Sequence, residues 1–284
     1  MAIILDGKEY SRICKENIMT EVQRLSELGH RPGMAVVLVG SNPASQVYVR
    51  NKEKDCQECG IYSAMYTLPE ETTEEQLLEL LDALNHDDSI HGILVQLPLP
   101  AHIDSQKVIE AIDPIKDVDA FHPTNVGYLT TGSPRFAPCT PAGIVKLMEH
   151  YGIDPQNKHC VVIGRSNIVG KPMALLLLAK NGTVTICHSG TQDLKSQTLQ
   201  ADILISAVGK TGFVTADMVK EGAVVIDVAM NRNAEGKLCG DVVYDEVAAK
   251  TSAITPVPGG VGPMTRVMLL ENTLTACKLQ CGLS

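Results

Sequence analysis

The chain has 284 residues, 44% hydrophobic and 20% charged, which is the balance of a folded globular protein of about two domains. Its 24 basic and 33 acidic side chains give a formal net charge of −9, which disfavours nucleic acid as a partner. No apolar run approaches the roughly 20 residues that span a bilayer. The start turns acidic at Asp6, unlike a secretory signal, so neither membrane insertion nor export is expected.

Nine cysteines are spread from Cys14 to Cys281 without the spacing of a disulfide framework. This pattern predicts reduced thiols and a cytoplasmic location. Cys56-x-x-Cys59 is a single pair with no second pair, so it predicts two packing thiols on one helix and no metal site.

Strands and helices alternate through the first half of the chain. Residues 34–39, 61–68 and 93–97 are rich in Val, Ile and Leu and predict strands. The predicted helices cover residues 8–29, 44–59, a segment after the capping-box pattern Thr72-x-x-Glu75, and a short stretch through 108–112. This order predicts an α/β domain with a parallel sheet covered on both faces. Binding residues are then expected after Val39, Val95 and Ile112.

The second half contains a glycine turn between a strand and a helix. The strand is 160–163, the turn runs from Gly164 to Pro172, and the helix begins at Met173. Further strands at 183–186, 203–206 and 224–227 predict a Rossmann-like, doubly wound domain. A helix N-terminus after such a turn attracts phosphate, although an ordinary tight strand-to-helix loop is the alternative.

The side chains near this turn bear on the choice of cofactor. The second strand of the domain ends in Cys187-His188-Ser189-Gly190 and offers no acidic residue to hold the ribose hydroxyls of NAD. Arg165 and Ser189 instead suit a 2′-phosphate, which favours NADP. The alternative is that Arg165 is a solvated turn residue.

Tyr48 and Lys52 share one face of a predicted helix because they are four residues apart. A lysine that works as a base near neutrality needs its pKa lowered from about 10.4 to about 7–8. Burial beside neutral partners can lower it, and Tyr48 and Gln96 are suitable partners. From the spacing alone, an exposed lysine lying along the helix is the favoured reading.

Two further segments could contribute to a site. The turn Lys116-Asp117-Val118-Asp119 offers a carboxylate for an aminopyrimidine edge, or else forms a structural Asx-turn. Residues 255–265 hold three prolines and three glycines before a helix that is expected from about Thr265. So stiff and small a loop lets another surface approach closely, or it is an interdomain linker.

With these residues in view, the chain resembles the bifunctional methylenetetrahydrofolate dehydrogenase/methenyltetrahydrofolate cyclohydrolase family over nearly its whole length. The motifs that carry the resemblance, in the family's order, are Tyr48-x-x-x-Lys52, Val95-Gln96-Leu97-Pro98, 116–119, Pro138-Cys139-Thr140-Pro141, 164–172 and 255–265. The resemblance implies oxidation of 5,10-methylenetetrahydrofolate with NADP and hydrolysis of the methenyl product to 10-formyltetrahydrofolate. It places the chain in one-carbon metabolism and purine biosynthesis.

The resemblance also implies roles for individual residues. Lys52 would assist the hydrolytic step, with Tyr48 packed on the folate, Gln96 tuning the lysine and Asp119 holding the pterin amino group. The residues implied at the cofactor are Gly164, Arg165, Ser166, Ile168, Ser189 and Thr140, and those implied near substrate and nicotinamide are Pro258, Gly259 and Gly260.

The implied architecture is a catalytic domain of residues 1–136, completed by a C-terminal helix at 268–284, and an NADP-binding Rossmann-like domain of residues 137–267 across a cleft. A homodimer formed through the nucleotide domains is also implied. Three positions depart from the family's usual pattern: Ala120 and Ala229 stand where glycine is usual, and Gly190 stands where many members carry a basic residue.

Three alternatives remain at this stage. A short-chain dehydrogenase shares the Tyr-x-x-x-Lys signature, but its glycine turn precedes the tyrosine, whereas here Gly164 follows Tyr48. A monofunctional dehydrogenase of the same family would keep only one of the two activities. A non-catalytic NADP-sensing module would not need Tyr48, Lys52, Gln96 and Asp119 together.

Overall fold

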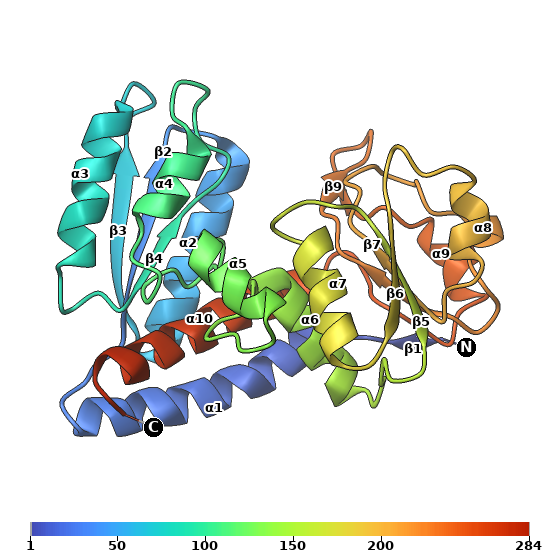
Figure 1. Ribbon diagram of the computed structural model, residues 1–284, viewed down its shortest axis with the longest axis horizontal. Coiled ribbons are helices and arrows are strands. Elements are labelled where there is room, and N and C mark those ends of the chain that lie inside the picture. The colour runs from blue at the N-terminus through green and yellow to red at the C-terminus, as the bar shows by residue number, and fades with distance from the viewer. Residues whose placement is uncertain (1, 284) are drawn as a thin grey trace. The chain divides into compact units, whose positions relative to one another are not determined.

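The computed structural model describes residues 2–283, apart from the side chain of residue 44 (Figure 1). These residues form two compact units. The six-stranded unit comprises the segment up to Arg12 together with Pro138–Met268, and the three-stranded unit comprises Ile13–Ala137 and the segment from Leu269 onward. The helices α1 (Gly7–Glu27) and α10 (Val261–Gln280) each begin in the first unit and end in the second.

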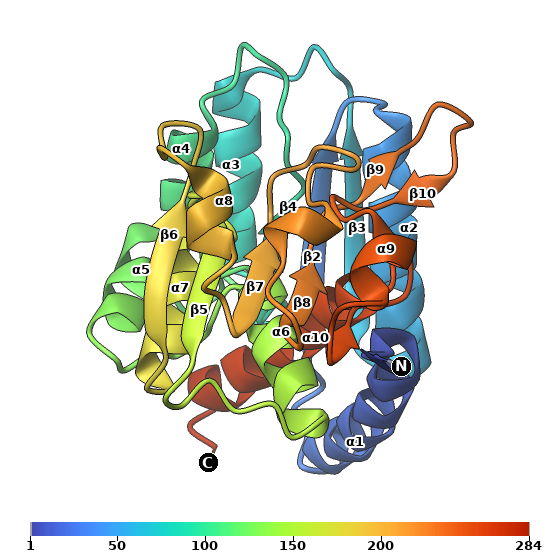
Figure 2. The same ribbon diagram turned by 90° about the vertical axis from the view of Figure 1, so that its right-hand side faces the viewer.

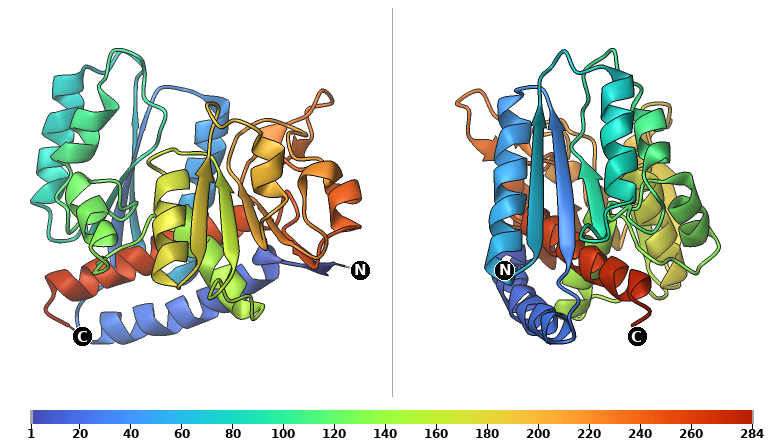
Figure 3. Two further views of the ribbon diagram at one scale, coloured as in Figure 1. Left: turned by 45° about the vertical axis from the view of Figure 1, so that its right-hand side comes forward. Right: turned by 90° about the vertical axis from the view of Figure 1, so that its left-hand side faces the viewer.

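The three-stranded unit is built on a parallel sheet in the order β3-β2-β4, which are Tyr62–Leu68, Gly33–Val39 and Gly92–Val95. Every residue of β2 is buried, as its continuous apolar sequence predicts. Helix α2 (Pro43–Cys59) covers one face of this sheet, and α3 (Glu74–Asn85) and α4 (Ser105–Ala111) cover the other (Figure 3). The short helix α5 (Pro123–Thr130) follows.

The six-stranded unit contains a parallel sheet in the order β1-β11-β8-β7-β5-β6. The strands are β1 (Ile3–Ile4), β5 (His159–Ile163), β6 (Thr183–Cys187), β7 (Ile203–Ser206), β8 (Val224–Asp227) and β11 (Ala253–Ile254). Figure 2 shows β6, β5, β7 and β8 side by side. The chain runs from β5 to β6 on one side and returns to β7 on the other, so the strand order reverses between β5 and β7. In sheets of this kind, ligands bind at the carboxyl ends of the strands at such a reversal.

The remaining elements of this unit surround the sheet or extend from it. They are α6 (Cys139–His150), α7 (Gly170–Ala179), α8 (Leu194–Thr198), the 3-10 helix η1 (Ala216–Met218), the hairpin of β9 (Asn231–Arg232) and β10 (Leu238–Cys239), and α9 (Tyr244–Ala248). The predicted α/β fold with two parallel sheets is confirmed. Among the helices of the described residues, none is long and apolar enough to cross a membrane.

By its contacts, the segment up to Arg12 joins the six-stranded unit, because β1 pairs with β11 at the edge of that sheet. Two local predictions are wrong. The capping box of α3 lies one residue later than predicted, with Thr73 and Gln76 exchanging hydrogen bonds. Helix α10 begins at Val261, four residues before the predicted start, so the glycine-rich segment enters its first turn.

Candidate active site

Lys52 and Gln96 meet at the carboxyl end of the three-stranded sheet. Lys52 lies on α2, and its Nζ donates a hydrogen bond of 3.1 Å to Oε1 of Gln96, the first residue after β4. The meeting follows from the topology, because α2 starts beyond the end of β2 and β2 is paired with β4. Lys52 is half-buried, whereas Tyr48, one turn earlier on the same helix, is 37% exposed.

The backbone around Gln96 fixes which of its amide atoms faces the lysine. Its Nε2 donates to the Leu97 carbonyl at 2.7 Å, and its main-chain N–H donates to the Val37 carbonyl at 2.8 Å. With the NH₂ group turned to a carbonyl, the side-chain oxygen is the atom that accepts from Lys52. The lysine contact is therefore built into the end of β4.

The two aspartates of the 116–119 turn have different environments. The carboxylate of Asp117 accepts from the backbone N–H of His122 and from Nδ2 of Asn125, both at 2.8 Å, and burial raises its pKa. Asp119 is half-buried and, with Phe121, lines a small cavity beside β4. Asp117 lines the same cavity, so the two differ in burial and partners: Asp117 is buried and bonded within the turn, which gives it a structural role, whereas Asp119 is half-buried.

Lys116 also has a structural role in this turn. Its Nζ donates to the backbone carbonyls of Leu84 at 3.1 Å and Asp87 at 2.8 Å, and burial lowers its pKa. These bonds anchor the turn to the end of α3.

In the six-stranded unit, the glycine turn after β5 is shaped by close backbone contacts. Gly164 has φ +129°, and a Cβ there would lie 2.6 Å from the Ala207 carbonyl oxygen. A Cβ on Gly170 would lie 2.2 Å from the carbonyl oxygen of Gly164. The hydroxyl of Ser166 accepts from the N–H groups of Val169 and Gly170. Both glycines are thus needed for the turn to close against β7.

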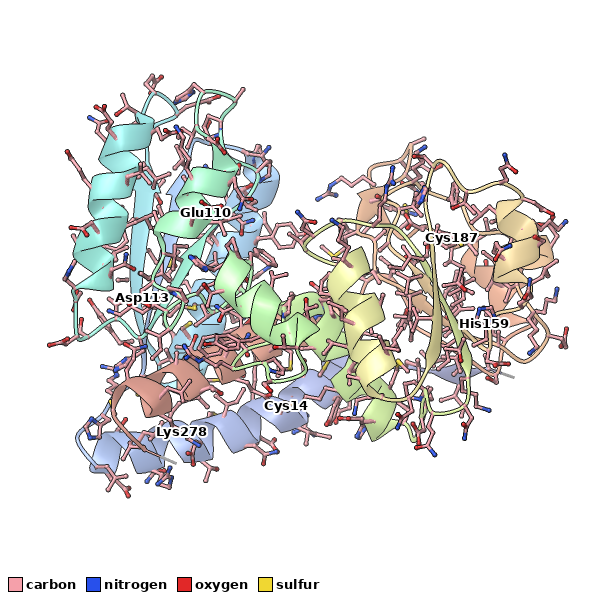
Figure 4. All side chains as sticks on the ribbon, in the orientation of Figure 1. Cys14, Glu110, Asp113, His159, Cys187 and Lys278 are labelled. Carbon is pink, nitrogen blue, oxygen red and sulfur yellow. The ribbon has the colours of Figure 1, made fainter. Side chains whose placement is uncertain are left out.

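The exposed side chains of this turn lie beside those that follow β6. Ile163 is paired with Cys187 at the ends of β5 and β6, so Arg165 and Ser189 each stand two residues beyond a matched pair. Arg165, Ser166, Ile168 and Ser189 are exposed. In Figure 4, Cys187 lies above His159, which marks the upper edge of this sheet as its carboxyl edge. A basic group, a hydroxyl and an open turn at this edge form a setting in which an anionic nucleotide fits.

The other predicted residues of this unit lie in two further places. The hydroxyls of Thr140, in the first turn of α6, and Thr265, on α10, are 3.0 Å apart. Pro258 is exposed and Gly260 is buried, and the Gly259 carbonyl accepts from the N–H of Lys8. The loop that contains these three residues lines a small cavity together with Ala229.

One group of side chains in the described part of the chain has metal-ligand character, namely His91, Cys277 and Cys281, whose ligand atoms lie within 4.8 Å of one another. The Nδ1 atom of His91 accepts from the N–H of Gly33 at 3.1 Å. This bond places the ring proton of neutral His91 on Nε2, the nitrogen that faces Cys281. A metal would need a lone pair at that position, so the tautomer opposes coordination.

Two buried carboxylates near the carboxyl edge of the six-stranded sheet were not predicted from the sequence. Asp227 ends β8 and Asp241 follows β10, and they are 3% and 0% exposed. No motif marks them. The only signal is an aspartate at the end of a buried strand and a Gly-Asp pair after a hairpin.

Comparison with known proteins identifies the family. Residues 5–119 match the catalytic domain, and residues 138–281 the NAD(P)-binding domain, of tetrahydrofolate dehydrogenase/cyclohydrolase. The bifunctional protein FolD of Paracidovorax citrulli is 61% identical over 281 residues, with 99% of both chains covered.

Solved structures agree with this match. The bifunctional methylenetetrahydrofolate dehydrogenase/cyclohydrolase FolD of Campylobacter jejuni superimposes with a TM-score of 0.97 at 53% identity, covering 99% of this chain and 100% of that one. The Trypanosoma brucei enzyme, complexed with NADP cofactor and inhibitor, superimposes with a TM-score of 0.95 at 38% identity, covering 99% and 98%. The resemblance inferred from the sequence motifs is confirmed, and the chain belongs to the bifunctional methylenetetrahydrofolate dehydrogenase/cyclohydrolase family.

Proposed function

We propose that this chain carries out both reactions of its family, with NADP as the oxidant and with Lys52 as the central residue of the hydrolytic step. The observation that carries the proposal is the hydrogen bond from Lys52 Nζ to Gln96 Oε1 at the carboxyl end of a parallel sheet. A sensing module has no use for a half-buried lysine held in this way.

The dehydrogenase reaction needs little acid–base chemistry from the protein. The chemistry that bound NADP would supply is acceptance of a hydride from the methylene carbon, and the folate nitrogens would stabilise the resulting cation. The task of the chain is to hold the reacting rings in position. We assign the pterin amino group to Asp119 because it is half-buried at the cavity, whereas Asp117, which lines the same cavity, is buried and its carboxylate accepts two N–H donors of the turn.

The cyclohydrolase reaction needs a positioned group that moves a proton as water attacks the methenyl carbon. Lys52 acts at Nζ, and Gln96 holds that nitrogen in place because its own amide is anchored to Leu97. Tyr48, one turn away and partly exposed, presents a ring on which the folate can pack.

The cofactor preference rests on Arg165 and Ser189. They follow neighbouring strands in matched register, and no carboxylate stands among the residues at the end of β6, Cys187 to Gly190. A guanidinium and a hydroxyl suit the 2′-phosphate of NADP. Gly190 stands where a basic residue is usual in the family, and because glycine has no side chain this position adds no charge. Its main-chain N–H donates to Nδ1 of His188.

We expect Arg165→Ala to lower kcat/KM for NADP by about 10–100-fold, since a charge-assisted phosphate contact is lost, and to leave kcat/KM for NAD nearly unchanged. The assay follows reduced-nicotinamide absorbance with methylenetetrahydrofolate and either cofactor. Wild-type protein should reduce NADP much faster than NAD. A wild-type preference for NAD would overturn the cofactor assignment while leaving the family intact.

Lys52→Met should lower the rate of methenyltetrahydrofolate hydrolysis by about 10²–10⁴-fold, the usual contribution of a positioned acid–base group, with the affinity for NADP unchanged. Lys54→Met is the matched control, because Lys54 lies on the same helix and is exposed. Hydrolysis is measured as the loss of methenyl absorbance. Full hydrolysis by the Lys52 variant would refute its role.

We further infer that the protein is a cytoplasmic homodimer formed through its six-stranded units. In that unit β6 is an edge strand with Ile186 39% exposed, and Leu178 on α7 is 60% exposed. All nine cysteines are free thiols, which suits a reducing compartment. Light scattering should give twice the mass of the chain, and Ile186→Lys should reduce that mass to the single chain. A single-chain mass for wild type would overturn the dimer.

A further inference from the structure

The loop after β7 is held by an internal carboxylate. Three successive main-chain N–H groups, those of Val208, Gly209 and Lys210, donate to Asp241 at 2.8, 3.2 and 2.7 Å. Successive amides that converge in this way form the concave site in which proteins often bind anions. Here the anion is a side chain of the same unit, so the loop is fixed from within.

The position of Asp241 is fixed by a second carboxylate, that of Asp227. Asp227, at the end of β8, accepts from the main-chain N–H groups of Asp241 at 3.0 Å and Val242 at 2.9 Å. The chain can approach so closely because residue 240 is glycine, where a Cβ would lie 1.9 Å from a carboxylate oxygen of Asp227. The end of β8 thus determines the position of Asp241, and Asp241 determines the conformation of the loop after β7.

That loop lies against the glycine turn. Ile163 and Ser206 are paired at the ends of β5 and β7, and Ala207 is the residue whose carbonyl a Cβ on Gly164 would strike at 2.6 Å. In Figure 2, β7 lies between β5 and β8. The reversal of strand order falls between β5 and β7, which is where a dinucleotide binds in sheets of this class.

We propose that Asp241 is a positioning residue for the dehydrogenase reaction, because it holds the loop after β7 in the shape that receives the dinucleotide beside Gly164. This inference rests on the proposed NADP-dependent function. Asp241 need not touch the cofactor, since it acts through the backbone of 208–210.

The hydrogen bonds explain why a carboxylate is required at this position. Five donors converge on Asp241, and both oxygens act only as acceptors. One oxygen accepts from Ser206 Oγ, Val208 N and Gly209 N, and the other accepts from Lys210 N and Asn231 Nδ2. An asparagine in either orientation would direct its NH₂ group at two or more of these donors. Asp241→Asn therefore keeps the volume of the side chain and breaks the loop contacts.

The test uses the full chain and measures both activities of the same sample. Asp241→Asn should raise KM for NADP about tenfold or more, the effect of losing one well-formed bond to a charge, with kcat at saturating NADP within threefold of wild type. Cyclohydrolase activity should stay within twofold, because Lys52 and Gln96 belong to the other unit. Asp245→Asn, an exposed aspartate on α9, is the matched control and should change neither activity.

A milder variant covers the case in which Asp241→Asn does not fold. Asn231→Ala removes one of the five donors to Asp241 and introduces no clash. Like Asp241→Asn, it should raise KM for NADP, here about two- to fivefold. An unchanged KM for NADP in both variants, or an equal loss of both activities in a folded sample, would overturn the positioning role. Absence of NADP reduction by wild type would instead refute the proposed function itself.

Discussion

At the residue scale, Ala120 adopts a conformation that costs free energy. Its φ is 59°, in the left-handed region that favours glycine, and its side chain is 1% exposed. A non-glycine residue there costs about 1–2 kcal/mol. The position follows Asp119 directly, so the turn that presents this carboxylate is the one that carries the strain.

We expect Ala120→Gly to be close to neutral, changing the unfolding free energy by less than about 0.5 kcal/mol. The relief of backbone strain offsets the loss of a buried methyl, about 0.8 kcal/mol, and the entropy of glycine in the unfolded chain, about 0.5–1 kcal/mol. The control is Ala35→Gly in β2, a buried alanine in regular strand conformation, which should cost roughly 1.3–1.8 kcal/mol. Urea unfolding measures both. Equal losses in the two variants would show that Ala120 is not strained.

At the element scale, the loops at the carboxyl edge of the six-stranded sheet depend on buried carboxylates. Burial raises the pKa of Asp227 to about 6, and the nearby Asp241 adds to the rise, while backbone N–H donors oppose it. Because the folded pKa lies above the unfolded value of about 3.9, folding favours the protonated form. The contribution to stability is complete below about pH 4 and is lost as pH rises through 6.

The unfolding free energy of wild type relative to Asp227→Asn should therefore fall by on the order of 3 kcal/mol between pH 4 and pH 7, the equivalent of about two pKa units. Asparagine occupies nearly the same volume and does not titrate. The comparison cancels the titration of all other groups, including Glu21, whose pKa the Arg24 and Lys278 side chains lower to about 2. Parallel pH profiles for the two proteins would contradict the raised pKa.

The central strands were predicted from strong local patterns, whereas the spacing of Tyr48 and Lys52 alone favoured an exposed lysine, and only the family resemblance pointed to Lys52 with Gln96. Continuous Val/Ile/Leu runs mark β2, β4, β5 and β7, and the Tyr-x-x-x-Lys spacing puts two side chains on one helical face. The pairing of β1 with β11 was not predictable, because each has two residues and they lie at opposite ends of the chain. Asp241 was missed for a similar reason: its five donors come from a loop and a hairpin that only the folded sheet brings together.

At the scale of the whole molecule, the last helix completes a site that the first half of the chain begins. Asn272 on α10 is 6% exposed, and its Nδ2 donates to the carbonyls of Val118 at 2.8 Å and Ala137 at 3.1 Å. Val118 precedes Asp119, so a residue 154 positions later in the sequence fixes the backbone of the turn that we assign to the pterin. Two further contacts attach α10 to the rest of the three-stranded unit. Lys278 forms an ion pair with Glu21, and Gln280 donates a hydrogen bond to the His91 carbonyl.

Asn272→Leu should destabilise the three-stranded unit by roughly 2–4 kcal/mol, because the buried carbonyl of Val118 and the part-buried carbonyl of Ala137 lose this donor, and losing such a bond costs about 1–3 kcal/mol. The same change should raise KM for folate through the displaced Asp119 turn while leaving the affinity for NADP unaltered. Urea unfolding and a separate NADP titration of the full chain distinguish the two effects. Thr275→Val is the control, since its hydroxyl donates to the Glu271 carbonyl of the same helix, and it should cost less than about 0.5 kcal/mol. If Asn272→Leu weakened NADP as much as folate, the last helix would serve both units equally, and the assignment of Asn272 to the folate turn would fail.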